Sequence, residues 1–282
     1  MIVQNTTDLE LIDAIKLSIK NKTPLSVVRC GDGEMHILKQ AIDFPGEQQQ
    51  LTHHHALCNI QFREAIWTCP THTSLQPGSI KPNTCECYLT DNDSITWRGL
   101  AKDVISYSIK HADYVGLVVP GRNLHYYNIS SGILKRYNID STQLNVISSL
   151  FPLDPMFGSI ESFKSIINGN DIHIVTPNVE RFKNGKIEEL LGVNVTYTDI
   201  SSDQSHTLEI RQQVKQSIID NPTQIILFGG GYAIKNLIPW AATEFGKIAL
   251  DIGSVLDAWS GLQSRHMFMK EELSHLNWIK NN

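Results

Sequence analysis

The chain has 282 residues, of which 41% are hydrophobic, so it is long enough to bury a large core as one α/β domain or as two smaller lobes. Its 24 basic and 29 acidic residues give a formal net charge of -5. This balance argues against the basic surface that nucleic-acid-binding proteins carry, and we expect no nucleic-acid partner.

The sequence also predicts the cellular location of the protein. The N-terminal residues lack the basic and apolar regions of a signal peptide, and no run approaches the roughly 18 apolar residues of a membrane span. We therefore expect a cytoplasmic protein. The five cysteines are odd in number and show no C-x-x-C spacing, which predicts free thiols rather than disulfides or a structural zinc site.

The first part of the chain predicts a helix and then a buried strand. Thr7 or Asp8 can cap a helix that runs to about Lys20, and an apolar strand follows over 25–28. An arginine, two glycines and two acids come directly after that strand: Arg29, Gly31, Asp32, Gly33 and Glu34. Two hard oxygen ligands beside an arginine suit a divalent cation that holds a diphosphate.

The middle of the chain is less regular. Helices are predicted around 56–67 and 98–111, and the polar stretch 70–83 contains proline and glycine and predicts a loop. A helical or loop insertion over about 50–112 is therefore expected within a single domain that spans 1–282.

From residue 114 onward, short apolar runs alternate with helical patterns. This rhythm predicts an α/β fold of Rossmann-like type, with a mostly parallel sheet flanked by helices. The predicted strands in this part are 114–119, 145–148, 171–175, 193–197, 224–228 and 247–250. Because the carboxyl ends of parallel strands share one edge, the polar residues that follow several of them should gather where ligands of open α/β sheets bind.

The strand at 224–228 runs into Gly229, Gly230 and Gly231 and then into a predicted helix. Free backbone N–H groups at such a helix start can receive a phosphate, and a glycine turn that packs the helix on the strand is an equal interpretation. Pro239 should kink this helix or end it early.

The segment Arg29-Cys-Gly-Asp-Gly-Glu34, together with the glycine turn and Ala249-Leu-Asp-Ile-Gly253, resembles the GT-D type glycosyltransferases of bacteria. The resemblance implies a Rossmann-like fold and an Asp-x-Glu pair needed for metal-dependent use of a nucleotide sugar. On this basis Asp32 and Glu34 are the metal-binding and catalytic acids, and Mn²⁺ or Mg²⁺ is the cofactor. The implied partners are a nucleotide-diphosphate sugar, with a UDP-sugar favoured, and a glycan, glycolipid or glycoprotein acceptor.

The remaining candidates follow from chemistry at the same edge. Arg29 is placed to bind phosphate oxygens, with an ion pair to Asp32 or Glu34 as the alternative, and Asp251 can accept a hydrogen bond from a sugar hydroxyl or cap the next helix. The glycines beside these residues complete the predicted nucleotide-sugar site. Three other cations are interpreted as solvent-exposed surface charges, namely Arg98, Arg122 and Lys235.

The tail predicts a helix over about 264–280 whose charges are balanced, so packing onto the domain is favoured over contact with the inner face of a membrane. Two other functions remain open for the chain as a whole. The glycine turn and the acid at a later strand end would also fit an S-adenosylmethionine-dependent methyltransferase. A non-catalytic nucleotide-binding module is the third interpretation.

Overall fold

A computed structural model describes residues 2–31, 34–35, 105–120, 124–177, 179–184, 187–201, 207–253 and 255–260. The predictions for 56–67, 70–83 and 264–280 lie outside these ranges, as does most of the predicted insertion. Residues 105–111, the described part of the predicted helix over 98–111, are helical. Within the described ranges, none of the helices combines the length and the apolar character needed to cross a membrane.

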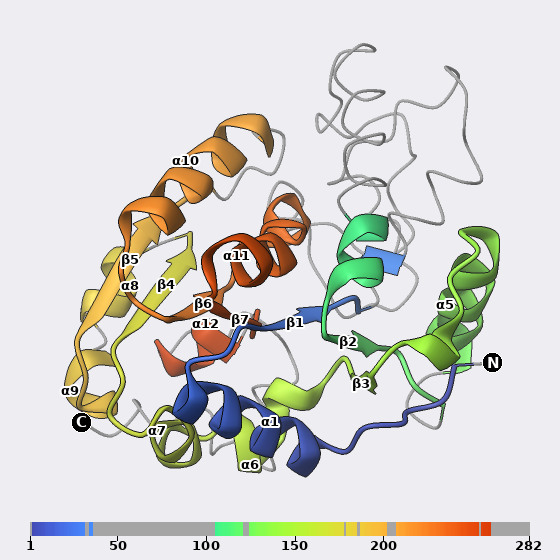
Figure 1. The fold of residues 1–282 in the computed structure, drawn as a ribbon, viewed down its shortest axis with the longest axis horizontal. Helices are drawn as coiled ribbons and strands as arrows, with labels where there is room; N and C mark the ends of the chain where they lie inside the picture. The colour runs from blue at the N-terminus through green and yellow to red at the C-terminus, as the bar shows by residue number, and fades with distance from the viewer. Residues whose placement is uncertain are drawn as a thin grey trace, which may run out of the picture.

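The described strands form one parallel sheet, in the order β3-β2-β1-β7-β6-β4-β5 (Figure 1). Every pairing between neighbours is parallel, and each strand predicted from the sequence is present. The fold is therefore the predicted α/β type with a Rossmann-like sheet. The strand bounds are β1 (Leu25–Arg29), β2 (Tyr114–Leu117), β3 (Val146–Ser148), β4 (Ile172–Thr176), β5 (Val195–Asp199), β6 (Ile225–Phe228) and β7 (Ile248–Asp251).

Helices cover both faces of the sheet, so alternate strand residues enter two separate cores. Val28 packs into one core and Val27 into the other, and both side chains are fully buried. Burial on both faces explains why β4, β6 and β7 are buried along their whole length, whereas the edge strand β5 has exposed residues. The first core also contains residues of α5 (Leu124–Arg136), α10 (Thr207–Asp220) and α11 (Leu237–Phe245). The second contains residues of α1 (Asp8–Asn21), α7 (Ile160–Ile167), α8 (Val179–Asn184), α9 (Ile187–Leu191) and α12 (Val255–Trp259), and of the short α6 (Pro155–Gly158).

The first helix begins as predicted. Thr7 is the N-cap of α1, its hydroxyl accepts from the Glu10 N–H, and the Glu10 carboxylate accepts from the Thr7 N–H at 2.7 Å. This reciprocal capping box satisfies two backbone donors that the helix itself leaves unpaired. Cys30, directly after β1, is buried and free, and burial raises the pKa of its thiol. The other four cysteines lie outside the described ranges.

The chain builds the sheet in two halves that meet at the β1–β7 pair. The first half supplies β1, β2 and β3 toward one edge, and the second half supplies β4 to β7 on the other side. The carboxyl ends of β1 and β7 therefore lie side by side where the two halves meet. In open α/β sheets, ligands bind in the crevice outside the carboxyl ends of the strands.

One prediction for the second half is wrong. The helix after the glycine turn does not start at the glycines and break at Pro239; a short 3₁₀ turn, η6 (Tyr232–Ile234), comes first, and α11 begins at Leu237. Pro239 thus lies in the first turn of α11. Proline is tolerated there because the N–H groups of the first turn have no partner within the helix.

Candidate active site

Glu34, shortly after β1, points back toward the end of that strand. The Glu34 Oε2 atom accepts a hydrogen bond from the Gly31 N–H at 3.0 Å, and the Met35 N–H donates to the Gly31 carbonyl at 3.1 Å. Gly31 and Glu34 are thus brought together. Asp32 and Gly33, the other two residues of the motif, lie outside the described ranges.

A buried lysine joins the motif to the end of β7. Lys235 is only 4% exposed, and its Nζ lies 3.1 Å from Glu34 Oε1 and 2.5 Å from Asp251 Oδ2. Asp251 is itself buried, and its Oδ2 also accepts from the Arg29 N–H at 3.0 Å. Two carboxylates and one ammonium group from three separate segments therefore meet at the carboxyl ends of β1 and β7. We call Arg29, Glu34, Lys235 and Asp251 the charge cluster.

The Arg29 side chain crosses the ends of the strands and is anchored on backbone carbonyls. Its Nε donates to the Ser149 carbonyl at 2.7 Å, and its Nη1 donates to the Ile252 carbonyl at 3.4 Å. Gly116 is the register partner of Arg29 on β2, and a Cβ there would lie 3.5 Å from Arg29 Cγ. Gly253 has φ +53°, and a Cβ at that position would collide with Arg29 Nη1. Gly253 therefore leaves room for this guanidinium, whereas a Cβ at Gly116 would crowd Ser149 Cα at 3.2 Å.

The electrostatics of the cluster keep its members charged. Burial by itself raises the pKa of Glu34, but Lys235 and the Glu34 backbone N–H lower it more, and the pKa falls to about 2. Burial likewise lowers the pKa of Lys235, and the two carboxylates more than reverse this, so the net direction is upward. Glu34 is therefore an anion at physiological pH, and Lys235 is a cation.

Lys235 corrects the interpretation from the sequence. We predicted an exposed surface charge at this position, and that prediction is wrong because the lysine is buried and paired with two acids. The signal available in the sequence was its setting, between Ile234 and the apolar pair Leu237 and Ile238. A single lysine in so apolar a segment needs a buried partner of opposite charge. Arg98 and Arg122 lie outside the described ranges.

Two glycines of the turn are needed for packing. A Cβ at Gly229 would lie 2.7 Å from Leu256 Cδ1, and a Cβ at Gly230 would overlap the side chains of Ile200 and Ile234. Gly231 is exposed and has φ +68°. Close packing is thus sufficient to explain glycine at positions 229 and 230. This packing holds the segment that carries Lys235 close to β6.

Asp251 is held within the charge cluster. Helix α12 begins only at Val255, and the Asp251 Oδ2 atom is engaged by Lys235 and the Arg29 N–H. Its carboxylate therefore holds the charge cluster together from the β7 side. A direct contact between Asp251 and a sugar hydroxyl stays a prediction.

The acids of the site have the donor chemistry for a divalent cation. Mg²⁺ and Mn²⁺ prefer hard oxygen ligands, and each oxygen of the ionised Glu34 uses one lone pair toward Lys235 or Gly31, which leaves a second lone pair on each. Among the described residues there is no group of three or more His, Cys, Asp or Glu side chains able to hold a metal ion. A site at the motif therefore needs Asp32 together with Glu34.

The parallel sheet defines a Rossmann-like α/β protein, with the charge cluster at the carboxyl ends of β1 and β7. A model of the GT-D fold-like domain matches residues 98–259, more than half of the chain. The chain therefore belongs to the GT-D-like family, which places it among the GT-D type glycosyltransferases and confirms the resemblance found in the sequence.

Solved structures share the architecture at low sequence identity. A selenomethionine-substituted domain of unknown function 1792 is 15% identical, with a TM-score of 0.50 over 94% of this chain and 80% of that one. A glycosyltransferase of the same domain type from Streptococcus sanguinis is 17% identical, with a TM-score of 0.45 over 92% of this chain and 82% of that one. No curated protein matches the sequence.

Proposed function

We propose that this protein transfers a sugar from a nucleotide-diphosphate donor, with a UDP-sugar favoured, to a glycan or glycan-bearing acceptor in the assembly of a cell-surface polysaccharide or glycoprotein. The observation that carries the proposal is the charge cluster at the carboxyl ends of β1 and β7, in a chain of the GT-D-like family. A donor diphosphate placed there would meet the Arg29 guanidinium and a divalent cation held by the acids.

The roles of the residues follow from their contacts. Arg29 uses its Nε and one Nη on backbone carbonyls, so its second Nη retains two N–H donors for phosphate oxygens. Lys235 holds the Glu34 carboxylate from one side while Gly31 holds it from the other. Glu34 is thus held in a fixed orientation beside Gly31, and preorganisation of this kind lowers the cost of binding charge.

Asp32 and Glu34 are the residues that would hold Mn²⁺ or Mg²⁺. Such a cation would neutralise charge on the leaving nucleotide diphosphate as the glycosidic bond breaks. The protein's own contribution is to keep Glu34 ionised and to anchor Arg29 beside it. An acid that is free of the cation can accept the proton of the acceptor hydroxyl, a contribution of about 10² to 10⁴ in rate.

Isothermal titration calorimetry with UDP and GDP tests this function. We expect UDP to bind in the presence of Mn²⁺, to lose affinity by about tenfold or more in EDTA, and to lose as much in Asp32→Asn. Asp13→Asn, which changes an exposed acid on α1, is the matched control and should leave affinity unchanged. Binding that needs no metal, or no binding to wild type, would overturn the proposal. Hydrolysis of a panel of UDP-sugars then identifies the donor.

The two alternatives give different results in simple assays. The glycine turn follows β6 rather than an early strand, so the geometry adds nothing in favour of a methyltransferase. A thermal shift with S-adenosylmethionine, and none with nucleotide sugars, would support that class. A non-catalytic module would bind nucleotide without turnover, and its affinity would be unchanged in Glu34→Gln.

A further inference from the structure

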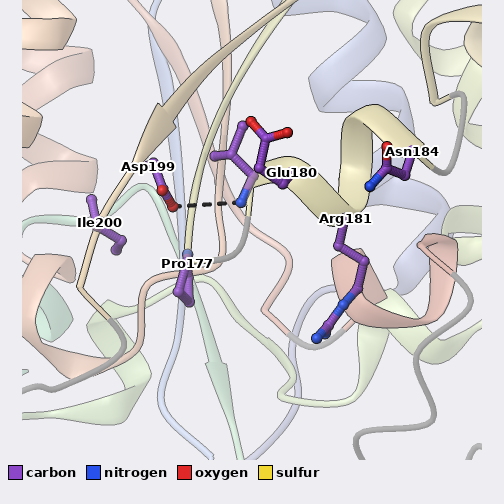
Figure 2. A pocket seen from close by; sticks show the side chains of 7 residues that line it. Pro177, Glu180, Arg181, Asn184, Asp199 and Ile200 are labelled. Carbon is purple, nitrogen blue, oxygen red and sulfur yellow. Dashed lines mark hydrogen bonds between the residues drawn. The ribbon is translucent and has the colours of Figure 1, made fainter.

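A second feature of the carboxyl edge is an open cavity at the ends of β4 and β5, on the far side of β6 from the charge cluster. Its volume is about 560 Å³, within the roughly 300 to 1,000 Å³ typical of small-molecule sites. Figure 2 shows Asp199 and Ile200 at the end of β5 on one side, side chains of α8 on the other, and Pro177 between them. The cavity is lined by Pro177, Val179, Glu180, Arg181, Asn184, Asp199 and Ile200.

The polar lining has hydrogen-bonding capacity that the described residues do not use. The Asp199 Oδ1 atom accepts from the Val179 N–H at 3.4 Å, whereas its Oδ2 has no partner among the residues that the structure describes. The same holds for the Arg181 guanidinium and the Asn184 amide within those ranges. Glu180 is paired only with the exposed Lys183, at 3.0 Å. A ligand in this cavity would thus meet both donors and acceptors.

The charges of the side chains that line the cavity indicate which class of ligand it can bind. One guanidinium stands against two carboxylates, so the cavity lacks the excess of positive charge that phosphate groups require. Carboxylates accept hydrogen bonds from hydroxyl groups, and an amide both donates and accepts. Pro177, Val179 and Ile200 add an apolar wall against which the C–H face of a pyranose ring can pack. This combination fits an uncharged, hydroxyl-rich ligand.

The cavity is connected to the charge cluster through the glycine turn. Ile200 lines the cavity, and its Cδ1 packs against Gly230, in the turn that leads to Lys235. Because neighbouring strands lie about 4.8 Å apart and β6 alone separates β4 from β7, the end of β4 is on the order of 10 Å from the end of β7. Two ligands bound side by side on this edge can therefore approach each other.

We infer that this cavity is the subsite for the acceptor sugar, and that Arg181, Asn184 and Asp199 bind its hydroxyl groups. The inference rests on the proposed function, because it takes the charge cluster as the donor site. It adds a second binding site, the class of ligand and the three residues that select it.

Saturation-transfer difference NMR on the full chain tests the inference. The probes are the p-nitrophenyl glycosides of glucose, galactose, N-acetylglucosamine and N-acetylgalactosamine, with p-nitrophenol as the control ligand. We expect saturation on the sugar-ring protons of at least one glycoside and a loss of affinity of about tenfold in Arg181→Ala/Asn184→Ala. Arg136→Ala, an exposed arginine at the end of α5, should retain binding.

UDP titration of the same variants separates this inference from the proposed function. The double variant should bind UDP with Mn²⁺ as tightly as wild type does. No saturation of sugar protons by wild type, saturation of the nitrophenyl ring alone, unchanged glycoside binding in the double variant, or a loss of UDP affinity in it would each overturn the acceptor subsite. If wild type binds a glycoside through Arg181 but does not bind UDP, the proposed function fails, and the acceptor role fails with it.

Discussion

The Lys235 ammonium lies 3.1 Å from Glu34 Oε1, so a residue beyond the glycine turn neutralises an acid of the Asp-x-Glu motif. The same ammonium contacts Asp251 at the end of β7. One cation thus fixes the relative position of two segments that are far apart in the sequence. Its removal should affect stability and the geometry of the motif together.

We predict that Lys235→Met is destabilised by about 3 kcal/mol, because it leaves two carboxylates buried without their counter-charge. Urea denaturation measures the loss. Combining it with Glu34→Gln should restore part of the stability, because the second change removes one of the unpaired charges. Additive effects of the two substitutions would contradict a direct interaction.

The depressed pKa of Glu34 predicts a pH dependence of stability. Since the folded-state pKa of about 2 is below the unfolded value near 4.5, the stabilisation is fully present above about pH 4.5 and is lost as the pH falls toward 2. The difference in unfolding free energy between wild type and Glu34→Gln should therefore shrink between pH 5 and about pH 3. A difference that stays constant over that range would show that Glu34 is not paired in the folded protein.

His173 on β4 predicts a second pH effect, away from the site. Asn221 Oδ1 accepts from the Thr223 N–H, so its amide nitrogen faces His173 Nδ1 at 2.9 Å, and His173 Nε2 donates to Thr198 Oγ1. Burial and, to a smaller extent, Lys247 lower the pKa of His173 to about 4. The neutral ring is also favoured because a protonated Nδ1 would face the Asn221 amide hydrogens.

Because the unfolded histidine binds its proton near pH 6.5, His173 should cost stability as the pH falls from 6.5 to about 4. His173→Gln is expected to be less stable than wild type at pH 7 by about 1 to 2 kcal/mol, and the gap should narrow toward pH 4.5. Urea denaturation at several pH values measures both effects. If the difference in unfolding free energy between wild type and His173→Gln widened on acidification, the pKa of His173 would be raised by folding rather than lowered.

Gly253→Ala is expected to weaken UDP binding as well as stability. The residue has φ +53°, and the added methyl group would displace the Arg29 guanidinium. Gly246→Ala is the matched control, because its φ is +63° and nothing lies within 4 Å of the added Cβ. Both variants should lose about 1 to 2 kcal/mol of stability from backbone strain. Only Gly253→Ala should also lose UDP affinity in calorimetry. Equal UDP affinities of the two variants would show that Arg29 does not take part in UDP binding.

The sequence alone determined the elements and their class. The cap at Thr7 or Asp8 and the short strand runs are local signals, and the structure has α1 and the seven strands in these regions. The parallel sheet followed from the alternation of strands with helical patterns. The motif that contains Glu34 follows β1 directly in the sequence, so its place beyond the carboxyl end of that strand was also a local signal.

The tertiary structure decided what the motif contacts. The apolar residues around Lys235 are a local signal of burial, but its partners are not encoded locally, because the two carboxylates come from the ends of β1 and β7. Nor does the sequence show that Arg29 lies across Gly116 and reaches Gly253, or that Arg181 and Asp199 border one cavity. These contacts depend on the order of the strands in the sheet. That order follows from packing on both faces of the sheet, which no single segment encodes.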